Sequence, residues 1–156
     1  MRYGITILVA GWLLSGCLLN NINPSQKLNE RVQEYSDATR WNRMDIAVQM
    51  VAAEYRDAFV KSHSAWGRAV EVADSELIHI QIAPDGNTAT STIAYSWYDL
   101  SAMTLARTVV KQQWNISGTY AVTGEVVVEG APELLPAAAP PSEQADEPAD
   151  RVASIR

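Results

Sequence analysis

The side chains able to carry acid–base chemistry in this sequence are two histidines and a small number of strand acids. A general base has to lie in a pocket beside its substrate. His79 alternates with Ile78 and Ile80, so it falls on the opposite face of its predicted strand. His63 lies within a polar run, residues 61–64, near the end of a helical stretch. We therefore expect both histidines on the surface of the molecule.

Asp99 and Glu125 are the two strand acids best placed to face a cavity. Asp99 closes a strand and Glu125 alternates with Val126, so we expect solvated positions for both. The two histidines are not spaced as a helical pair with a glutamate between them, and the chain has one cysteine. A metal site therefore lacks ligands. The sequence also has no phosphate loop and no Gly-x-Ser-x-Gly elbow, and we expect no cofactor.

Arg107 and Lys111 are four residues apart on one predicted strand. This spacing places them on one face, roughly 13 Å apart. Two cations so placed can meet an anionic ligand. The interpretation we favour is that they belong to the polar outer face of a half-buried sheet.

Tryptophan and tyrosine are the least ordinary part of the composition, because the chain has a single phenylalanine. Their side chains can line a pocket while keeping a polar group available to a ligand or partner. The candidate pocket residues are Tyr55, Trp66, Tyr95, Trp97 and Trp114. The alternative, which we favour, is that the rings fill the core.

The elements that must position these residues begin with helices. Asn23 and Pro24 supply a helix cap and a proline at the first helical position. The apolar stripe of this first helix consists of Leu28, Val32 and Tyr35. A second helical stretch covers residues 41–64, with a break near Ala52.

After Gly67 the apolar period changes to two, which is the period of a strand. The predicted strands cover residues 70–82, 88–99, 104–114 and 119–128, the first with an interruption at 73–76. The alternating positions that share a face are Ile93, Tyr95 and Trp97 on the second strand, and Tyr120, Val122, Val126 and Val128 on the last. Short turns indicate an antiparallel meander. The predicted fold class is α+β, with N-terminal helices on one face of a curved antiparallel sheet.

The first residues are typical of an export signal. Arg2 precedes an apolar run of roughly a dozen residues, whereas a membrane-spanning helix needs about 20. The run ends in Leu14-Ser15-Gly16-Cys17, which resembles the lipobox of bacterial lipoproteins. The resemblance implies that a signal peptide, residues 1–16, is removed and that Cys17 becomes the lipidated N-terminus.

The residue that follows the lipidated cysteine indicates the membrane to which the protein is sorted. Leu18 follows the cysteine where an aspartate would, by the same resemblance, favour the inner membrane. We therefore expect the outer membrane of the cell envelope, facing the periplasm. Cleavage of the signal peptide takes away one of the 12 basic residues and none of the 18 acidic ones. The mature chain then has 11 basic residues and a net charge of 11 − 18 = −7. Such a chain is unsuited to nucleic acid, and its membrane attachment depends on the lipid.

The mature chain then divides into three segments. Residues 17–23 form a short tether, in which the six residues after Cys17 reach roughly 20 Å when extended. Residues 24–130 form the α+β domain. Residues 131–156 hold five of the seven prolines among alanines and acids, a composition typical of a disordered tail.

The domain resembles the nuclear-transport-factor-two-like superfamily, a cone in which N-terminal helices pack into the concave face of a bent antiparallel sheet. The stretch that carries the resemblance runs from Ala94-Tyr95-Ser96-Trp97-Tyr98 through Leu105, Thr108, Gln112, Trp114 and Gly118. It is more narrowly similar to uncharacterised bacterial lipoproteins of this type. The superfamily includes enzymes and binding modules. Its enzymes place an acid or a histidine inside the cone.

Because no acid or histidine is expected inside the cone, the sequence favours a non-enzymatic binding or assembly module anchored at the envelope. Its expected partners are the membrane, through the lipid, and either an envelope protein or a small apolar ligand. The alternative is a small enzyme of the cyclase or isomerase type, in which Asp99 or Glu125 acts on an apolar ligand.

Overall fold

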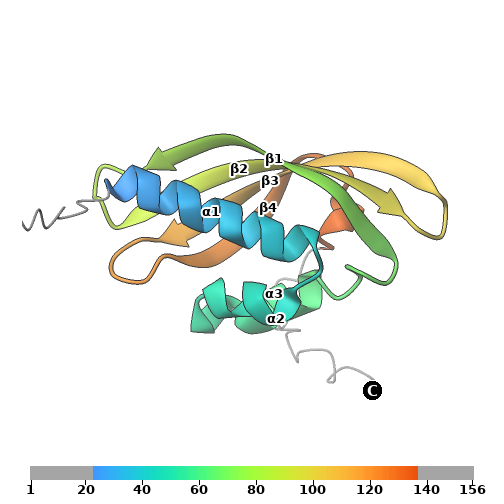
Figure 1. The fold of residues 1–156 in the computed structure, drawn as a ribbon, viewed down its shortest axis with the longest axis horizontal. Coiled ribbons are helices and arrows are strands. Elements are labelled where there is room, and N and C mark those ends of the chain that lie inside the picture. The colour runs from blue at the N-terminus through green and yellow to red at the C-terminus, as the bar shows by residue number, and fades with distance from the viewer. Residues whose placement is uncertain (1–22, 137–156) are drawn as a thin grey trace, which may run out of the picture.

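The computed structural model describes residues 23–136, which form an α+β domain (Figure 1). The helices are α1 (Pro24–Arg40), α2 (Met44–Ala47) and α3 (Arg56–Ser62), with the 3-10 turns η1 (Val48–Met50) and η2 (Ala53–Tyr55). The strands are β1 (Val70–Ile82), β2 (Thr88–Asp99), β3 (Thr104–Asn115) and β4 (Ala121–Gly130), followed by the 3-10 turn η3 (Pro132–Leu134). They form one sheet in the order β1-β2-β3-β4 with antiparallel neighbours. The predicted fold class and meander are confirmed.

Several predictions concern residues outside the described range. These are the signal peptide at 1–16, the lipidated Cys17 with its tether up to residue 22, and the tail beyond residue 136. They stay predictions.

The helices begin and break where the sequence indicates. The Asn23 side chain caps α1 by accepting a hydrogen bond from the Ser25 N–H at 3.1 Å. The second helical stretch is interrupted after η1, because Val51 forms an isolated bridge with Val122 and the Ala52 N–H donates to the Val122 carbonyl at 2.8 Å. The break near Ala52 therefore lets the helical layer bond directly to the edge strand β4.

The core lies between the helices and the concave face of the sheet (Figure 1). Its largest fully buried side chains include Tyr35 from α1, Phe59 from α3, Tyr95 from β2 and Trp114 from β3. The Tyr35 ring meets the Trp114 ring edge-on, with centroids 5.8 Å apart. Full burial of a large apolar side chain contributes about 1.5–3 kcal/mol, so these rings supply much of the stability of the domain.

A β-bulge in β4 decides which of its residues face the core. Trp114 pairs with Val122 and Gln113 pairs with Gly124, which leaves Thr123 as an extra residue. One extra residue reverses the alternation of the side chains that follow, as far as a second register shift that leaves Val128 as an extra residue.

The prediction that Val122, Val126 and Val128 share a face is consequently wrong beyond the bulge. Val122 is fully buried, whereas Val126 and Val128 are 50% and 54% exposed. The inward positions after the bulge belong to Glu125 and to Val127, which packs against the core.

Deletion of Thr123 is expected to keep Glu125 facing inward. A regular strand running from Val122 directly to Gly124 has the same alternation as the bulged strand, so the inward set does not change. We expect a loss of about 1 kcal/mol in the free energy of unfolding, measured by urea denaturation. A loss as large as that caused by removing the Glu125 carboxylate would show that the deletion had turned this residue outward.

The folded domain continues past the expected boundary at Gly130. The C-terminal strap, residues 131–136, packs on the hydrophobic core, with Leu134 fully buried and Leu135 8% exposed. The Trp66 indole N–H donates to the Leu134 carbonyl at 2.8 Å. The prediction of a disordered tail beginning at residue 131 is therefore wrong for residues 131–136.

Gly130 allows the strap to turn back beneath the sheet. Its φ is 87°, and a Cβ atom there would lie 2.2 Å from the Arg107 carbonyl oxygen. The Thr108 hydroxyl then donates to the Ala131 carbonyl at 2.8 Å and fixes the first residue of the strap. Only glycine combines this backbone conformation with so close an approach.

Candidate functional site

The carboxylate of Glu125 is buried inside the domain, with the side chain 1% exposed. The bulge places it directly opposite Gln112 on β3. Its Oε1 accepts hydrogen bonds from the Tyr35 hydroxyl and from Gln112 Nε2, both at 3.0 Å. The expected solvated position of Glu125 was wrong, because the alternation was read without the bulge.

His63 is the second buried polar group, and its expected surface position was also wrong. It caps the C-terminus of α3 and is 4% exposed. The ring lies between Phe59 and Trp66, with centroids at 4.2 and 4.6 Å. The flanking Lys61 and Ser64 are exposed, so the polar run around His63 is divided between surface and core.

The Glu125 and His63 side chains face each other. Oε2 of Glu125 lies 3.5 Å from Nε2 of His63. Nδ1 of His63 lies 3.0 Å from the Phe59 carbonyl oxygen. A carbonyl oxygen can only accept, so Nδ1 carries the hydrogen and Nε2 of the neutral ring is an acceptor.

A polar chain extends from this pair across the concave face of the sheet. The Trp114 indole N–H donates to Ser91 Oγ at 2.9 Å, and Ser91 Oγ donates to Gln112 Oε1 at 2.7 Å. Gln112 Nε2 then donates to Glu125 Oε1, which links these residues to the Glu125–His63 pair. The buried polar groups of Trp114, Ser91 and Gln112 are satisfied in this way, which fixes the orientation of the Gln112 amide.

The titration of the groups around Glu125 is shifted by burial. Burial lowers the pKa of His63, an effect that Glu125 and the Phe59 carbonyl partly offset. Burial, followed by the charge of Glu125, raises the pKa of Tyr55 to about 12. The same two causes raise the pKa of Tyr35 and of Tyr95. The three phenols are therefore neutral donors at physiological pH.

The stability of the domain is expected to fall on acidification below pH 6.5. The unfolded chain binds a proton on His63 near pH 6.5, whereas the lowered pKa keeps the folded state from binding it until a lower pH. The unfolded state thus binds more protons in this window, and the free energy of unfolding decreases by up to about 1.4 kcal/mol per pH unit.

Urea denaturation between pH 7.5 and pH 5 measures this slope. His63→Gln should remove the part of the slope that arises from the histidine. His79→Gln, at an exposed position, is the matched control and should retain the slope of the unmodified chain. Equal slopes in all three proteins would contradict the role given to His63.

The five predicted pocket aromatics do not converge on one cavity. Trp66, Tyr95, Trp97 and Trp114 are each less than 5% exposed and belong to the core. The Trp97 indole N–H donates to the Thr108 hydroxyl at 3.0 Å. Trp66 and Trp114 border two separate pockets, whereas Tyr55 is half-buried and lines a third pocket, beside Glu125.

That pocket lies between α3, β4 and the strap, with a volume of about 350 Å³. Its apolar walls include Ala58, Val127 and Leu135, and Ser62 and Glu125 also line it. In size it falls in the range of small-molecule sites. The Glu125 side chain is 1% exposed and its Oε2 is buried, so the carboxylate itself is enclosed behind this wall of the pocket.

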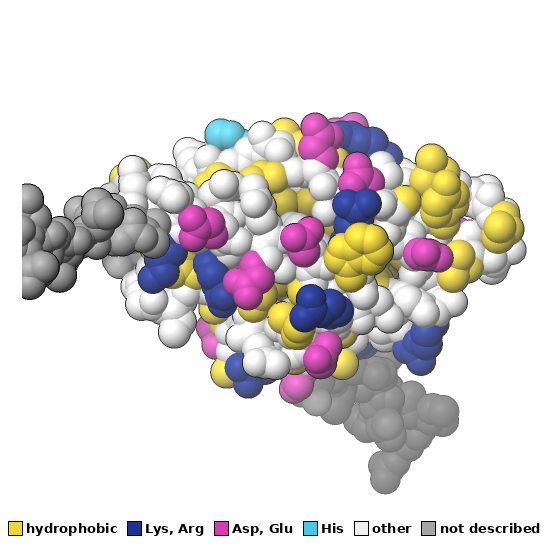
Figure 2. Space-filling view, in the orientation of Figure 1, with side chains coloured by type: hydrophobic (Ala, Val, Ile, Leu, Met, Phe, Trp, Pro, Cys, Tyr) yellow, Lys and Arg dark blue, Asp and Glu magenta, His cyan; other side chains and the backbone are white. Residues whose placement is uncertain are grey.

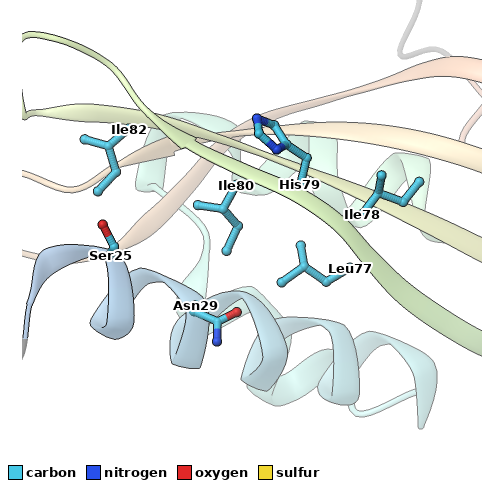
Figure 3. A pocket seen from close by; sticks show the side chains of 7 residues that line it. All are labelled: Ser25, Asn29, Leu77, Ile78, His79, Ile80 and Ile82. Atoms are coloured by element: carbon cyan, nitrogen blue, oxygen red, sulfur yellow. The ribbon is translucent and has the colours of Figure 1, made fainter.

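A second groove, with a volume of about 460 Å³, lies between α1 and β1 (Figure 3). Leu77 and Ile80 point toward α1, whereas His79 points away on the opposite side of the strand. Register shifts between Leu77 and His79 leave Ile78 as an extra residue, 50% exposed. His79 thus lies on the outer face as predicted, and three isoleucines, Ile78, Ile80 and Ile82, line the groove.

The remaining charged candidates lie on the outside. The Asp99 carboxylate accepts hydrogen bonds from the Ser101 N–H at 2.8 Å and the Ala102 N–H at 3.1 Å, so it caps the turn after β2. The hydrogen bond from the Ser101 hydroxyl, followed by those from the two N–H groups, lowers the pKa of Asp99. Arg107 and Lys111 are exposed on β3, as expected for an outer face.

No family model matches the chain, and no curated protein matches it. Among solved structures, the intermembrane space region of the chloroplast protein ARC6 aligns with 66% of this chain and 92% of its own, at 11% identity and a TM-score of 0.36. Between residues 23 and 136, no helix is long and apolar enough to span a bilayer. The same residues hold no cluster of three or more side chains suited to a metal ion.

Proposed function

We propose that this protein is an envelope lipoprotein, lipidated at Cys17, whose domain is a non-enzymatic binding or assembly module. The proposal rests on an apolar hairpin tip, residues 98–105, at the end of the domain remote from the start of α1. Within this hairpin, Met103 is 78% exposed and Leu105 61% exposed. Tyr98 pairs directly with Leu105 across the two strands and is itself 41% exposed.

The hairpin tip is built to hold this apolar surface in place. The cap by Asp99 fixes the turn, and Met103 adopts a left-handed conformation with a φ of 53°. Figure 2 shows hydrophobic side chains gathered at the end of the molecule where this hairpin lies. Exposed apolar surface of this kind, with a charged rim, is typical of protein contacts.

The location of the hairpin suits a tethered module. α1 begins near the turn between β1 and β2, since Ser25 and Ile82 line the same groove. The strand β2 has 12 residues and separates that turn from the hairpin tip by roughly 36 Å. A tether at Asn23 therefore leaves the hairpin directed away from the anchored end, where it can meet an apolar surface of an envelope protein.

Photocrosslinking in intact cells tests the contact. A photoreactive amino acid replaces Met103 in the full chain, and the matched control carries it at Asn87, in the turn at the other end of β2. We expect a discrete protein adduct from position 103 and a much weaker one from position 87. Equal labelling at both positions, or labelling of lipid alone, would contradict the proposal.

The lipid anchor is tested separately. Cys17→Ala should leave the chain unprocessed or release it from the membrane fraction, while the domain keeps its fold. Processing and membrane attachment that survived the change would contradict the lipoprotein assignment and would leave the crosslinking result intact.

The second candidate function is an enzyme of the cyclase or isomerase type. Burial of the Glu125 carboxylate beside His63 and next to a pocket favours it. Asp99 is not a candidate, because its carboxylate caps an exposed turn. If a deletion strain has an envelope defect, the enzyme hypothesis expects Glu125→Gln to fail in restoring it. The binding hypothesis expects Met103→Asp to fail instead.

A further inference from the structure

The outer face of the sheet carries a polar pocket beside the turn between β1 and β2. Its volume is about 430 Å³, which falls in the range of small-molecule sites. The lining residues that matter for its chemistry are Gln81, Ala83, Pro84, Thr90, Lys111 and Gln113. We call this hollow the outer-face pocket.

Three of the lining side chains form a row across the sheet. Gln81, Thr90 and Gln113 are paired in register on β1, β2 and β3, so they are direct neighbours on one face. The inward positions on either side of Thr90 belong to the buried Ala89 and Ser91, so the row faces outward. Amide and hydroxyl side chains both donate and accept hydrogen bonds. The row therefore offers donors and acceptors together.

Lys111 adds one positive charge beside this row. It is exposed on β3, on the same face as Gln113 and roughly 7 Å from it along the strand. No carboxylate of residues 23–136 lies within 4.0 Å of its ammonium group. Arg107, which shares this face, lies 4.0 Å from Glu76 and does not line the pocket. Of these two cations, only Lys111 can meet an anion in the outer-face pocket.

The adjacent turn contains one acid, Asp85. Its Oδ1 accepts hydrogen bonds from the Asn87 N–H at 2.9 Å and the Thr88 N–H at 3.1 Å. The carboxylate thus caps its own turn, and Asp85 does not line the pocket. Lys111 is the one charged residue among the described residues that do.

These groups restrict the chemistry of a ligand. A single lysine matches a singly charged anion, such as a carboxylate. An anion alone has only acceptors, so it would bring no donor to the amide oxygens of Gln81 and Gln113. Hydroxyl groups donate as well as accept, and they suit the row. Ala83 and Pro84 add apolar surface, which suits the C–H face of a sugar ring.

We propose that the outer-face pocket binds a sugar acid, a hydroxyl-rich ring that carries one carboxylate. The carboxylate contacts the Lys111 ammonium group, and the ring hydroxyls exchange hydrogen bonds with the row of Gln81, Thr90 and Gln113. The pocket lies at the opposite end of β2 from the hairpin tip. The site is therefore separate from the proposed protein contact.

Isothermal titration calorimetry on the full chain tests the proposal, in a polyoxyethylene detergent because its head group contains no sugar. The probes are glucuronate, glucose and acetate. Glucose lacks the carboxylate, and acetate lacks the hydroxyl-rich ring. We expect glucuronate to bind about fivefold more tightly than glucose, which is the upper range for an exposed ion pair, and more tightly than acetate.

Two pairs of variants locate the binding. Lys111→Met should lower the affinity for glucuronate to that for glucose. Arg107→Met is its matched control, because it removes the same charge from the same strand and face outside the pocket, and it should keep the affinity. Thr90→Val removes a hydroxyl of the row and should weaken both sugars. Thr92→Val, at the next outward position of β2 and outside the lining, should weaken neither.

Four outcomes would overturn the proposal. The first is the absence of saturable glucuronate binding. Equal affinities for glucuronate and glucose would show that the ammonium group plays no part, and equal affinities for glucuronate and acetate would show the same for the row. An equal loss in Lys111→Met and Arg107→Met would show that net charge, rather than the pocket, attracts the probe. None of these outcomes bears on crosslinking at Met103, so the two proposals fail independently.

Discussion

Replacing Glu125 by alanine is expected to lower the free energy of unfolding by about 3 kcal/mol. The change removes the acceptor of the Tyr35 hydroxyl and of the Gln112 amide, both inside the core. A buried donor left without a partner costs about 1–3 kcal/mol, and two such donors are created at once. Equilibrium urea denaturation at pH 7.5 measures the difference.

Glu125→Gln is the matched control, because it removes the charge and keeps the acceptor. Its free energy of unfolding should stay within about 1 kcal/mol of that of the unmodified chain. If both variants lost the same 3 kcal/mol, the negative charge rather than the hydrogen-bond acceptor would be the stabilising property. The interpretation of the network as a satisfied polar chain would then be wrong.

Truncation after Gly130 is expected to have an even larger effect, a loss of about 5 kcal/mol. It removes the buried side chains of Leu134 and Leu135, each contributing about 1.5–3 kcal/mol. It also deprives the Trp66 indole and the Thr108 hydroxyl of the carbonyls to which they donate. Since domains of this size are stable by about 5–15 kcal/mol, the truncated domain should be largely unfolded at physiological temperature.

Truncation after Pro136 is the control, because it keeps the whole strap. Its urea midpoint should match that of the full chain. A third variant, Leu134→Ala in the full chain, should lose about 2–5 kcal/mol by opening a cavity in the core. Equal stability of the two truncated proteins would place the boundary at Gly130, as the composition of the sequence alone indicates.

The sequence was sufficient to predict the helices, strands and turns, because each of them depends on a local pattern of residues. The stripe of α1, the cap at Asn23 and the turns of the meander all depend on residues a few positions apart. The break at Ala52 was visible for the same reason.

The candidate site was missed because it depends on a register that no local pattern reveals. Thr123 is an ordinary strand residue, and only its pairing with β3 makes it a bulge. That single extra residue moved Glu125 from the outer face to the core. One local signal did exist: Gln112 alternates with Val110 and Trp114, and a polar residue at an inward position needs a buried partner.

His63 and the strap were missed for a related reason. The buried position of His63 is set by Trp66 and by Glu125, which lies far away in the sequence. Residues 131–136 have the composition of a tail, yet two adjacent leucines among the prolines are enough to anchor them. Composition describes a whole segment, whereas burial is decided by single side chains.

The strap also constrains the order of events when the chain folds from its N-terminus. The bond from Trp66 to Leu134 joins residues 68 positions apart, and the bond from Tyr35 to Glu125 joins residues 90 positions apart. Neither contact exists until nearly the whole domain has emerged from the ribosome. Contacts of such long sequence separation slow folding. The domain therefore closes only after residues 131–136 have been synthesised and released.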